Sequence, residues 1–166
     1  LLKMNLKILF LVIYLTTLNF IIKSQNEVSI KLKIELIHYE NSKNHLKNCT
    51  VKISKNNTEF DNFKISSHNF QKKITSKGIY KFQLSHEGYV SKYFTIDAKN
   101  IPKKKIAHRL KAEISLFKYN EENQFDFLKK EPVSIAYYDY TKKKLMWDFE
   151  YNRVIRDKII EAQISK

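Results

Sequence analysis

Hydrophobic and polar residues alternate along much of this chain with a period of two. The clearest case is the segment 28–36, where every second residue is valine, isoleucine or leucine and the residues between them are serine, lysine and glutamate. This period predicts a β-strand that buries one face. Similar patterns predict further strands at 50–53, 60–65, 70–75, 79–84, 89–96, 112–119 and 133–140.

Polar segments separate the predicted strands. Asn56 and Asn57 fit a hairpin turn, because asparagine tolerates positive φ. The chain has only two glycines, Gly78 and Gly88, and both lie at the ends of strands in the hairpin predicted for 79–96. We expect them to hold backbone geometry that other residues adopt poorly. About seven short strands joined by polar turns predict a mainly β fold, an antiparallel β-sandwich.

Near the C-terminus the hydrophobic period changes to that of a helix. Apolar residues spaced by four predict a helix of about 15 residues with one apolar stripe. The stripe and the residues beside it are Trp147, Tyr151, Val154, Ile155, Ile159 and Ala162. We expect this stripe to pack on the sandwich, and contact with a membrane surface is the alternative. Residues 141–166 are therefore predicted to form a helical extension of a sandwich domain at 25–140.

The first residues have the composition of a secretory signal. Lys3 and Lys7 flank Met4 and precede the segment 8–22, which is almost wholly apolar. A short basic region followed by such a stretch is typical of a signal peptide, whereas a membrane-spanning helix needs about 20 apolar residues. We predict a signal peptide over residues 1–24 and an exported protein. A buried N-terminal core helix is the alternative.

The chain is strongly basic, with 31 lysines and arginines, 17 acidic residues and a formal net charge of +14. Removing the signal peptide with its three lysines lowers the formal charge to +11. Only three of the basic residues are arginines, the side chain that nucleic-acid readers favour for phosphate and guanine. We therefore interpret most of the lysine excess as surface composition, and we expect no nucleic-acid partner.

Aromatic residues are interleaved with lysines at 80–82 and 92–94. Such interleaving occurs on surfaces that stack single-stranded nucleic acid. The period of two instead predicts that these aromatic side chains lie on the face opposite one set of lysines. A packed core therefore accounts for both segments.

Motifs for catalysis or metal binding are absent from the sequence. Two glycines are too few for a glycine-rich phosphate loop, and a single cysteine, Cys49, excludes an intramolecular disulfide and a multi-cysteine zinc site. The five histidines lack the spacing of metal ligands. We expect Cys49 to be buried and predict no catalytic residue, cofactor or metal. An enzyme of unrecognised type is the alternative, if a histidine meets Cys49 or a carboxylate in a pocket.

Two lysine-rich segments are candidate interaction surfaces. The first follows Pro102 in a predicted loop, and the second, 142–144, lies in a predicted turn. The residues of the first that we expect to contact an anionic ligand are Lys103, Lys104, Lys105, Arg109 and Lys111. Each such charge contributes about 1 kcal/mol near an anionic surface. The alternative is that both segments are ordinary solvated loops.

The hairpin that contains the two glycines resembles a known family. Residues 78–84 (GIYKFQL) and 88–92 (GYVSK) are similar to the Gly-x-Tyr/Phe-x-Phe strand and its Gly-Tyr partner in carboxypeptidase-regulatory-like, or transthyretin-like, domains of exported Bacteroidetes proteins. The resemblance covers residues 28–118 and implies an immunoglobulin- or transthyretin-like sandwich without catalytic residues of its own. The C-terminal part is similar only to uncharacterised extensions.

These features predict a non-enzymatic exported β-sandwich that serves as a structural or protein-interaction module of the bacterial envelope. We expect it in the periplasm or at the cell surface of a Gram-negative bacterium, with other envelope proteins or an anionic polymer as partners. The alternative function is binding of anionic envelope ligands, either lipid head groups or polyanions, through the lysine-rich loops. The sequence leaves membrane contact after signal removal undecided.

Overall fold

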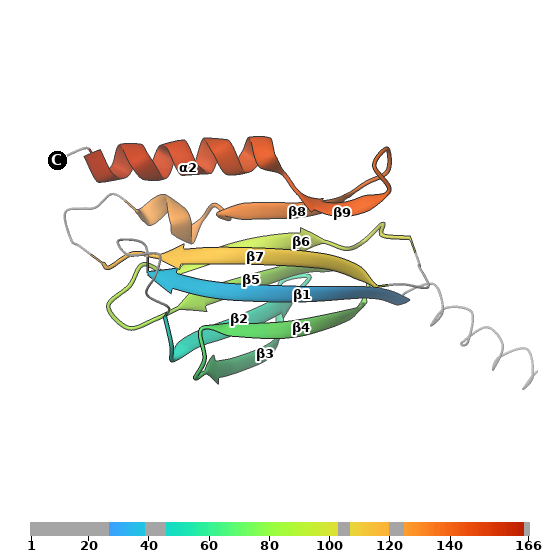
Figure 1. Cartoon of the computed structure of the whole chain (residues 1–166), viewed down its shortest axis with the longest axis horizontal. Coiled ribbons are helices and arrows are strands. Elements are labelled where there is room, and N and C mark those ends of the chain that lie inside the picture. Colours follow the sequence, from blue (N-terminus) through green and yellow to red (C-terminus); the bar gives the residue numbers. More distant parts are fainter. Residues whose placement is uncertain (1–26, 39–45, 103–106, 120–124, 165–166) are drawn as a thin grey trace, which may run out of the picture.

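The computed structural model of the chain describes residues 27–38, 46–102, 107–119 and 125–164. Within these ranges nine strands form two sheets, accompanied by a short 3-10 helix, η1 (Asp126–Lys129), and an α-helix, α2 (Phe149–Ile164) (Figure 1). The strands are β1 (Glu27–His38), β2 (Cys49–Lys55), β3 (Thr58–Ile65), β4 (Asn69–Ser76), β5 (Ile79–Ser85), β6 (Lys92–Asp97), β7 (His108–Leu116), β8 (Ser134–Asp139) and β9 (Lys144–Trp147). The predicted signal peptide, residues 1–24, lies outside the described residues.

The two sheets are mixed, which corrects the predicted antiparallel arrangement. One sheet has the strand order β4-β1-β7 and the other β3-β2-β5-β6-β8-β9. The pairs β1–β7 and β6–β8 are parallel, and the remaining pairs are antiparallel. Alternation along a strand indicates which side chains are buried but not the direction of its neighbours. Between β6 and β8 the chain passes through β7 and η1, and this long connection allows a parallel pair.

The main core lies between the inner faces of the two sheets. The alternation predicted for β1 is confirmed, because its five apolar side chains, from Val28 to Leu36, are at most 5% exposed. Phe82 and Phe94 are fully buried and stack with their ring centroids 5.0 Å apart. Cys49 is buried as predicted, and burial raises the pKa of its thiol to about 11. The thiol is therefore unreactive at neutral pH, since the thiolate is the nucleophile.

The predicted turn residues have the expected backbone geometry. Asn56 and Asn57 join β2 to β3 with φ values of 50° and 68°. Gly78 and Gly88 have φ values of 151° and 74°, which favour glycine. A Cβ atom at Gly78 would also lie 2.7 Å from Cε of Lys55. One of these glycines directly precedes β5, and the other lies in the turn between β5 and β6.

The C-terminal helix runs alongside β8 and packs on the sandwich (Figure 1). The carboxylate of Asp148 accepts a hydrogen bond from the Tyr151 backbone N–H at 3.0 Å, which caps the start of α2. A second buried cluster joins α2 to the sandwich, and it consists of Val90, Phe117, Phe125, Leu128 and Ile155, with Tyr151, Ile159 and Ala162 packed against it. The predicted packing of the apolar stripe is confirmed by this cluster.

Two residues assigned to the stripe lie elsewhere. Trp147 ends β9, which pairs with β8 inside the region predicted as a helical extension. Val154 is on the helix, but its side chain is 51% exposed. A few residues of apolar spacing do not distinguish a short strand from the start of a helix. The pairing with β8 decides the structure of residues 144–147 in favour of a strand.

Candidate functional site

The outer face of the three-stranded sheet carries five cations in two adjacent rows. Apolar side chains of β1, β4 and β7 build the core, so the residues between them face away from it. In one row Lys31 lies between Lys73 and Arg109, and in the next Lys33 lies beside Lys111. All five side chains are exposed. We call these five residues the basic face.

Like charges lie directly opposite each other on the basic face. Opposite residues of neighbouring strands have Cβ atoms about 5 Å apart, and two unit charges about 6 Å apart repel by about 0.7 kcal/mol in water. None of the five cations forms an ion pair with another residue in the described ranges. The next row carries Glu35 opposite Glu113, which gives the face an acidic border. The described part of the protein thus leaves this positive charge unneutralised.

Only part of the predicted anionic-ligand site falls on this face. Arg109 and Lys111 were predicted in a loop, but β7 begins at His108 and includes both. Pairing with β1 over residues 108–116 explains the earlier start of this strand. The lysines at 103–105 lie outside the described residues. In the segment 142–144, the first two lysines occupy the predicted turn and the third begins β9.

A cleft lies between β7 and the segment that runs from β8 to α2. Its cavity of about 320 Å³ is lined by residues of β6, β7, β8, β9 and α2. On one side the Trp147 Nε1 donates a hydrogen bond to the Lys111 carbonyl oxygen at 2.8 Å. On the other, the Ser134 hydroxyl donates to the Asn152 Oδ1 at 2.8 Å. The first contact joins β9 to β7, and the second joins β8 to α2.

Lys92 lies at this cleft with its side chain inside the protein. Its residue is 4% exposed and shares the inner face of β6 with Phe94. The Nζ donates to the Ser115 carbonyl oxygen at 2.7 Å and lies 4.0 Å from the centroid of the Phe117 ring. Burial lowers the pKa of Lys92 from its ordinary 10.5 to about 7.

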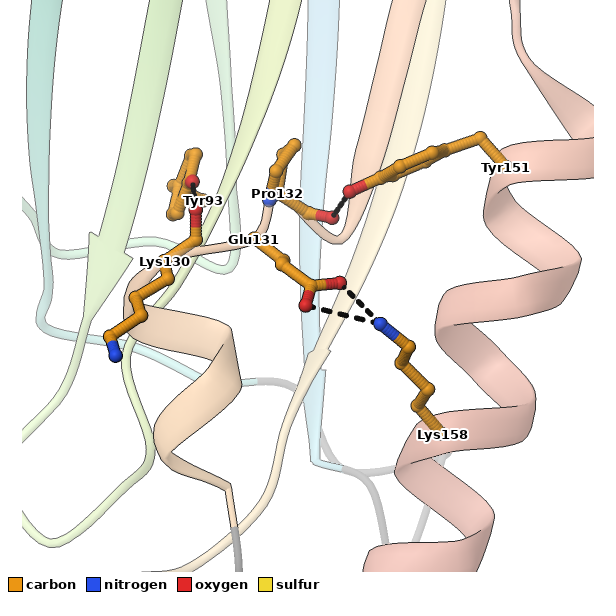
Figure 2. A network of polar contacts seen from close by, with 6 residues as sticks. All are labelled: Tyr93, Lys130, Glu131, Pro132, Tyr151 and Lys158. Carbon is orange, nitrogen blue, oxygen red and sulfur yellow. Dashed lines mark hydrogen bonds and ion pairs between the residues drawn. The ribbon is translucent and has the colours of Figure 1, made fainter.

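The loop after η1 contacts α2 through two polar interactions (Figure 2). Lys158 of α2 contacts both carboxylate oxygens of Glu131, at 2.8 and 3.1 Å, and the Tyr151 hydroxyl donates to the Pro132 carbonyl oxygen at 2.9 Å (Figure 2). Burial, with the nearby Glu131 charge as a smaller cause, raises the pKa of Tyr151 to about 12. Its hydroxyl therefore remains a hydrogen-bond donor at neutral pH. Helix α2, which forms one wall of the cleft, is therefore held to this loop through Tyr151 and Lys158.

Neither a metal-ligand cluster nor a cysteine–histidine pair in the cleft occurs among the described residues. Among them, no three histidine, cysteine, aspartate or glutamate side chains gather as metal ligands. The cleft is lined by neither Cys49 nor a histidine, and Cys49 Sγ lies 3.9 Å from the Lys47 carbonyl oxygen. No helix in the described ranges is long and apolar enough to cross a membrane.

Sequence reasoning named Arg109 and Lys111 as ligand contacts, did not name the other three residues of the basic face, and missed Lys92. The period of two already placed Lys31 and Lys33 on the polar side of their strand, but their neighbours Lys73 and Arg109 follow only from strand pairing. A signal for Lys92 existed, because it precedes Phe94 by two residues and so shares its face. Lys92 was not assigned to either face of its strand from the sequence.

Comparisons with known proteins concern the fold alone. No protein-family model matches the chain, and no curated protein matches it. It is similar in structure to the Bacillus anthracis TIE protein, with a TM-score of 0.44 and 18% sequence identity over 55% of this chain and 18% of that chain. It is also similar to 3-chlorocatechol 1,2-dioxygenase from Rhodococcus opacus 1CP, with a TM-score of 0.40 and 12% identity over 56% of this chain and 60% of that chain. The two sheets described above form a β-sandwich-like fold, and both structural similarities are distant.

Proposed function

We propose that this protein is a non-enzymatic exported β-sandwich whose basic face binds anionic lipid head groups of a bacterial envelope. The observation that carries the proposal is the pair of cation rows on the three-stranded sheet, where Lys31 stands between Lys73 and Arg109 and Lys33 beside Lys111. An anionic surface would relieve their mutual repulsion.

The composition of the face favours lipid phosphates over other anions. Four of its five cations are lysines, whose compact ammonium acts as a point charge and so suits a charged surface better than a ligand held by paired hydrogen bonds. The two rows hold no aromatic side chain on which a sugar ring or a base would stack. Rows on a sheet present several charges to one surface at once, and a basic segment gains about 1 kcal/mol per charge near an anionic leaflet.

The sequence supports an envelope setting for this activity. Residues 1–24 have the pattern of a signal peptide. The hairpin at 78–92 resembles transthyretin-like regulatory domains of exported Bacteroidetes proteins, which supports a binding role in place of catalysis. In this proposal the finer assignment is a transthyretin-like sandwich in the periplasm or at the surface of a Gram-negative cell. Because one fold hosts many functions, the basic face and not the fold carries the argument.

Vesicle binding tests the proposal. The purified chain should bind vesicles that contain phosphatidylglycerol, and binding should weaken as the salt concentration rises. Replacing Lys31, Lys33, Arg109 and Lys111 together by glutamine should weaken binding by up to about a thousandfold, at about 1 kcal/mol per charge.

A matched variant separates the basic face from net charge. Replacing the exposed lysines at 47, 64, 118 and 130 by glutamine removes the same charge from other surfaces and should leave most of the binding intact. Both variants keep the apolar segment at 8–22, so any membrane affinity of that segment affects them equally. Equal loss in both variants, or equal binding to vesicles of phosphatidylcholine alone, would contradict the proposal. Preference for a soluble polyanion such as heparin over the vesicles would contradict the lipid assignment.

A further inference from the structure

The buried ammonium of Lys92 is not neutralised by the described part of the protein. One carbonyl oxygen, that of Ser115, accepts a hydrogen bond from it at 2.7 Å, and an ammonium has three N–H donors. No described carboxylate lies within ion-pair distance of its Nζ. A buried charge without a counter-ion is costly, and an anion bound beside it would offset that cost.

The cleft offers room for such an anion next to Lys92. Its volume of about 320 Å³ is at the lower end of the range found for small-molecule sites, about 300–1,000 Å³. A second donor lies on its α2 wall, because the Asn152 side chain accepts from Ser134 through Oδ1 and leaves Nδ2 for another partner. Lys92 and Asn152 line the same cavity. They provide one positive charge and one neutral donor for an anionic group.

The remaining lining is mixed, because Lys111, Glu113, Ser115 and Ser134 line the cavity together with apolar residues. Ile114 of β7, Val133, Trp147 of β9 and Ile159 of α2 contribute to the walls. Along β7, Trp147 is bonded to the Lys111 carbonyl oxygen, and Lys92 to that of Ser115. These carbonyls are four residues apart, or about 13 Å along a strand. A ligand that lies between these two points has an anionic end at Lys92 and an apolar body toward Trp147.

We propose that the cleft between β7 and α2 binds a small organic carboxylate, with its carboxylate at Lys92 and Asn152 and its apolar body against Trp147 and Ile159. A single buried cation matches the single charge of a carboxylate better than the double charge of a phosphate monoester. This site shares only Lys111 with the basic face, and its ligand differs from a lipid phosphate. Failure of one proposal therefore leaves the other standing.

Titration with hydrocinnamate, a phenyl ring on a short aliphatic acid, tests the site in the full chain. Trp147 is the only tryptophan, so its fluorescence reports on the cleft without labelling. We expect saturable binding of hydrocinnamate with a Kd below about 1 mM at pH 6. The uncharged hydrocinnamyl alcohol should bind about ten- to a hundredfold more weakly, because it lacks the charge-assisted contact with Lys92.

Two substitutions assign the binding to the cleft. Lys92→Met removes the cation but keeps an unbranched side chain, and it should weaken hydrocinnamate binding by about ten- to a hundredfold while leaving the alcohol unaffected. Ile159→Phe fills apolar space and should weaken binding of both compounds. Lys64→Met, on the exposed side of β3, is the matched control and should change neither.

The result does not depend on the variants folding. In the unmodified protein, an NMR titration should shift the backbone amides of residues 111–115 and 133–134, which line the cavity. Shifts confined to other regions would overturn the proposal, as would equal affinity for the acid and the alcohol. A Kd for hydrocinnamate weaker than about 1 mM, together with unchanged Trp147 fluorescence, would overturn it as well.

Discussion

Replacing Lys92 by methionine should change how the stability of this protein depends on pH. The unfolded chain exposes Lys92 to water and holds its proton up to its ordinary pKa of 10.5, whereas burial in the folded protein lowers that pKa to about 7. Between pH 7 and 10.5 the unfolded state therefore binds more protons, and stability rises with pH. Below pH 7 the full cost of the buried charge is present.

The size of the effect follows from these two pKa values. At about 1.36 kcal/mol per pH unit, a pKa that falls from 10.5 to about 7 corresponds to a cost of about 5 kcal/mol at low pH. Integration over the titration leaves a cost of about 2 kcal/mol at pH 9. Raising the pH from 6 to 9 should therefore stabilise the wild-type protein by about 2–3 kcal/mol relative to Lys92→Met.

Urea unfolding monitored by Trp147 fluorescence measures this difference at each pH. The absolute stability of the variant also depends on the Ser115 carbonyl oxygen, which loses its donor, and on the lost contact with the Phe117 ring. Both effects change the free energy of unfolding of the variant by a similar amount at every pH. The quantity to compare is therefore how the difference in free energy of unfolding between the two proteins changes with pH. Lys64→Met, which removes an exposed lysine, is the matched control.

A difference in free energy of unfolding between the wild-type protein and Lys92→Met that stays constant from pH 6 to 9 would refute the reasoning. It would mean that Lys92 keeps its proton in the folded state throughout this range, so that its contacts with Ser115 and Phe117 offset burial. An equal change in Lys64→Met would refute it too, because the effect would then belong to the loss of any lysine.

Three further results are expected. Lys31→Glu converts two like-charge neighbours into opposite-charge pairs, and should raise the free energy of unfolding by about 0.5–2 kcal/mol in urea titrations while weakening vesicle binding. Gly78→Ala should lower the free energy of unfolding by about 1–3 kcal/mol, because φ is positive there and Lys55 lies close to the new Cβ. Gly88→Ala should lower it less, because nothing lies within 4 Å of a Cβ at that position. Cys49 should react with a thiol reagent at neutral pH only after urea unfolds the chain, since burial raises its pKa to about 11; rapid reaction in native buffer would contradict its burial.

The sequence by itself determined the described strands other than β9, the apolar faces of those strands and several of the turns. A period of two requires only that one side of a strand meets a core and the other meets water, so the alternation in β1 and the burial of Cys49 were readable without a structure. Positive φ at Gly78, Gly88 and the Asn56-Asn57 turn depends on local sterics, which residue identity also reveals.

Only the tertiary structure decided which strands are neighbours, and both candidate sites depend on that. Strand direction and register are set by long connections between sheets, so the parallel pairing of β1 with β7, which brings Lys31 beside Arg109, leaves no trace in either segment. The same holds for Lys92, whose surroundings come from β7 and α2, far away in the chain. Trp147 likewise lies in a strand because residues 144–147 pair with β8. This pairing outweighs a helical spacing of only a few residues.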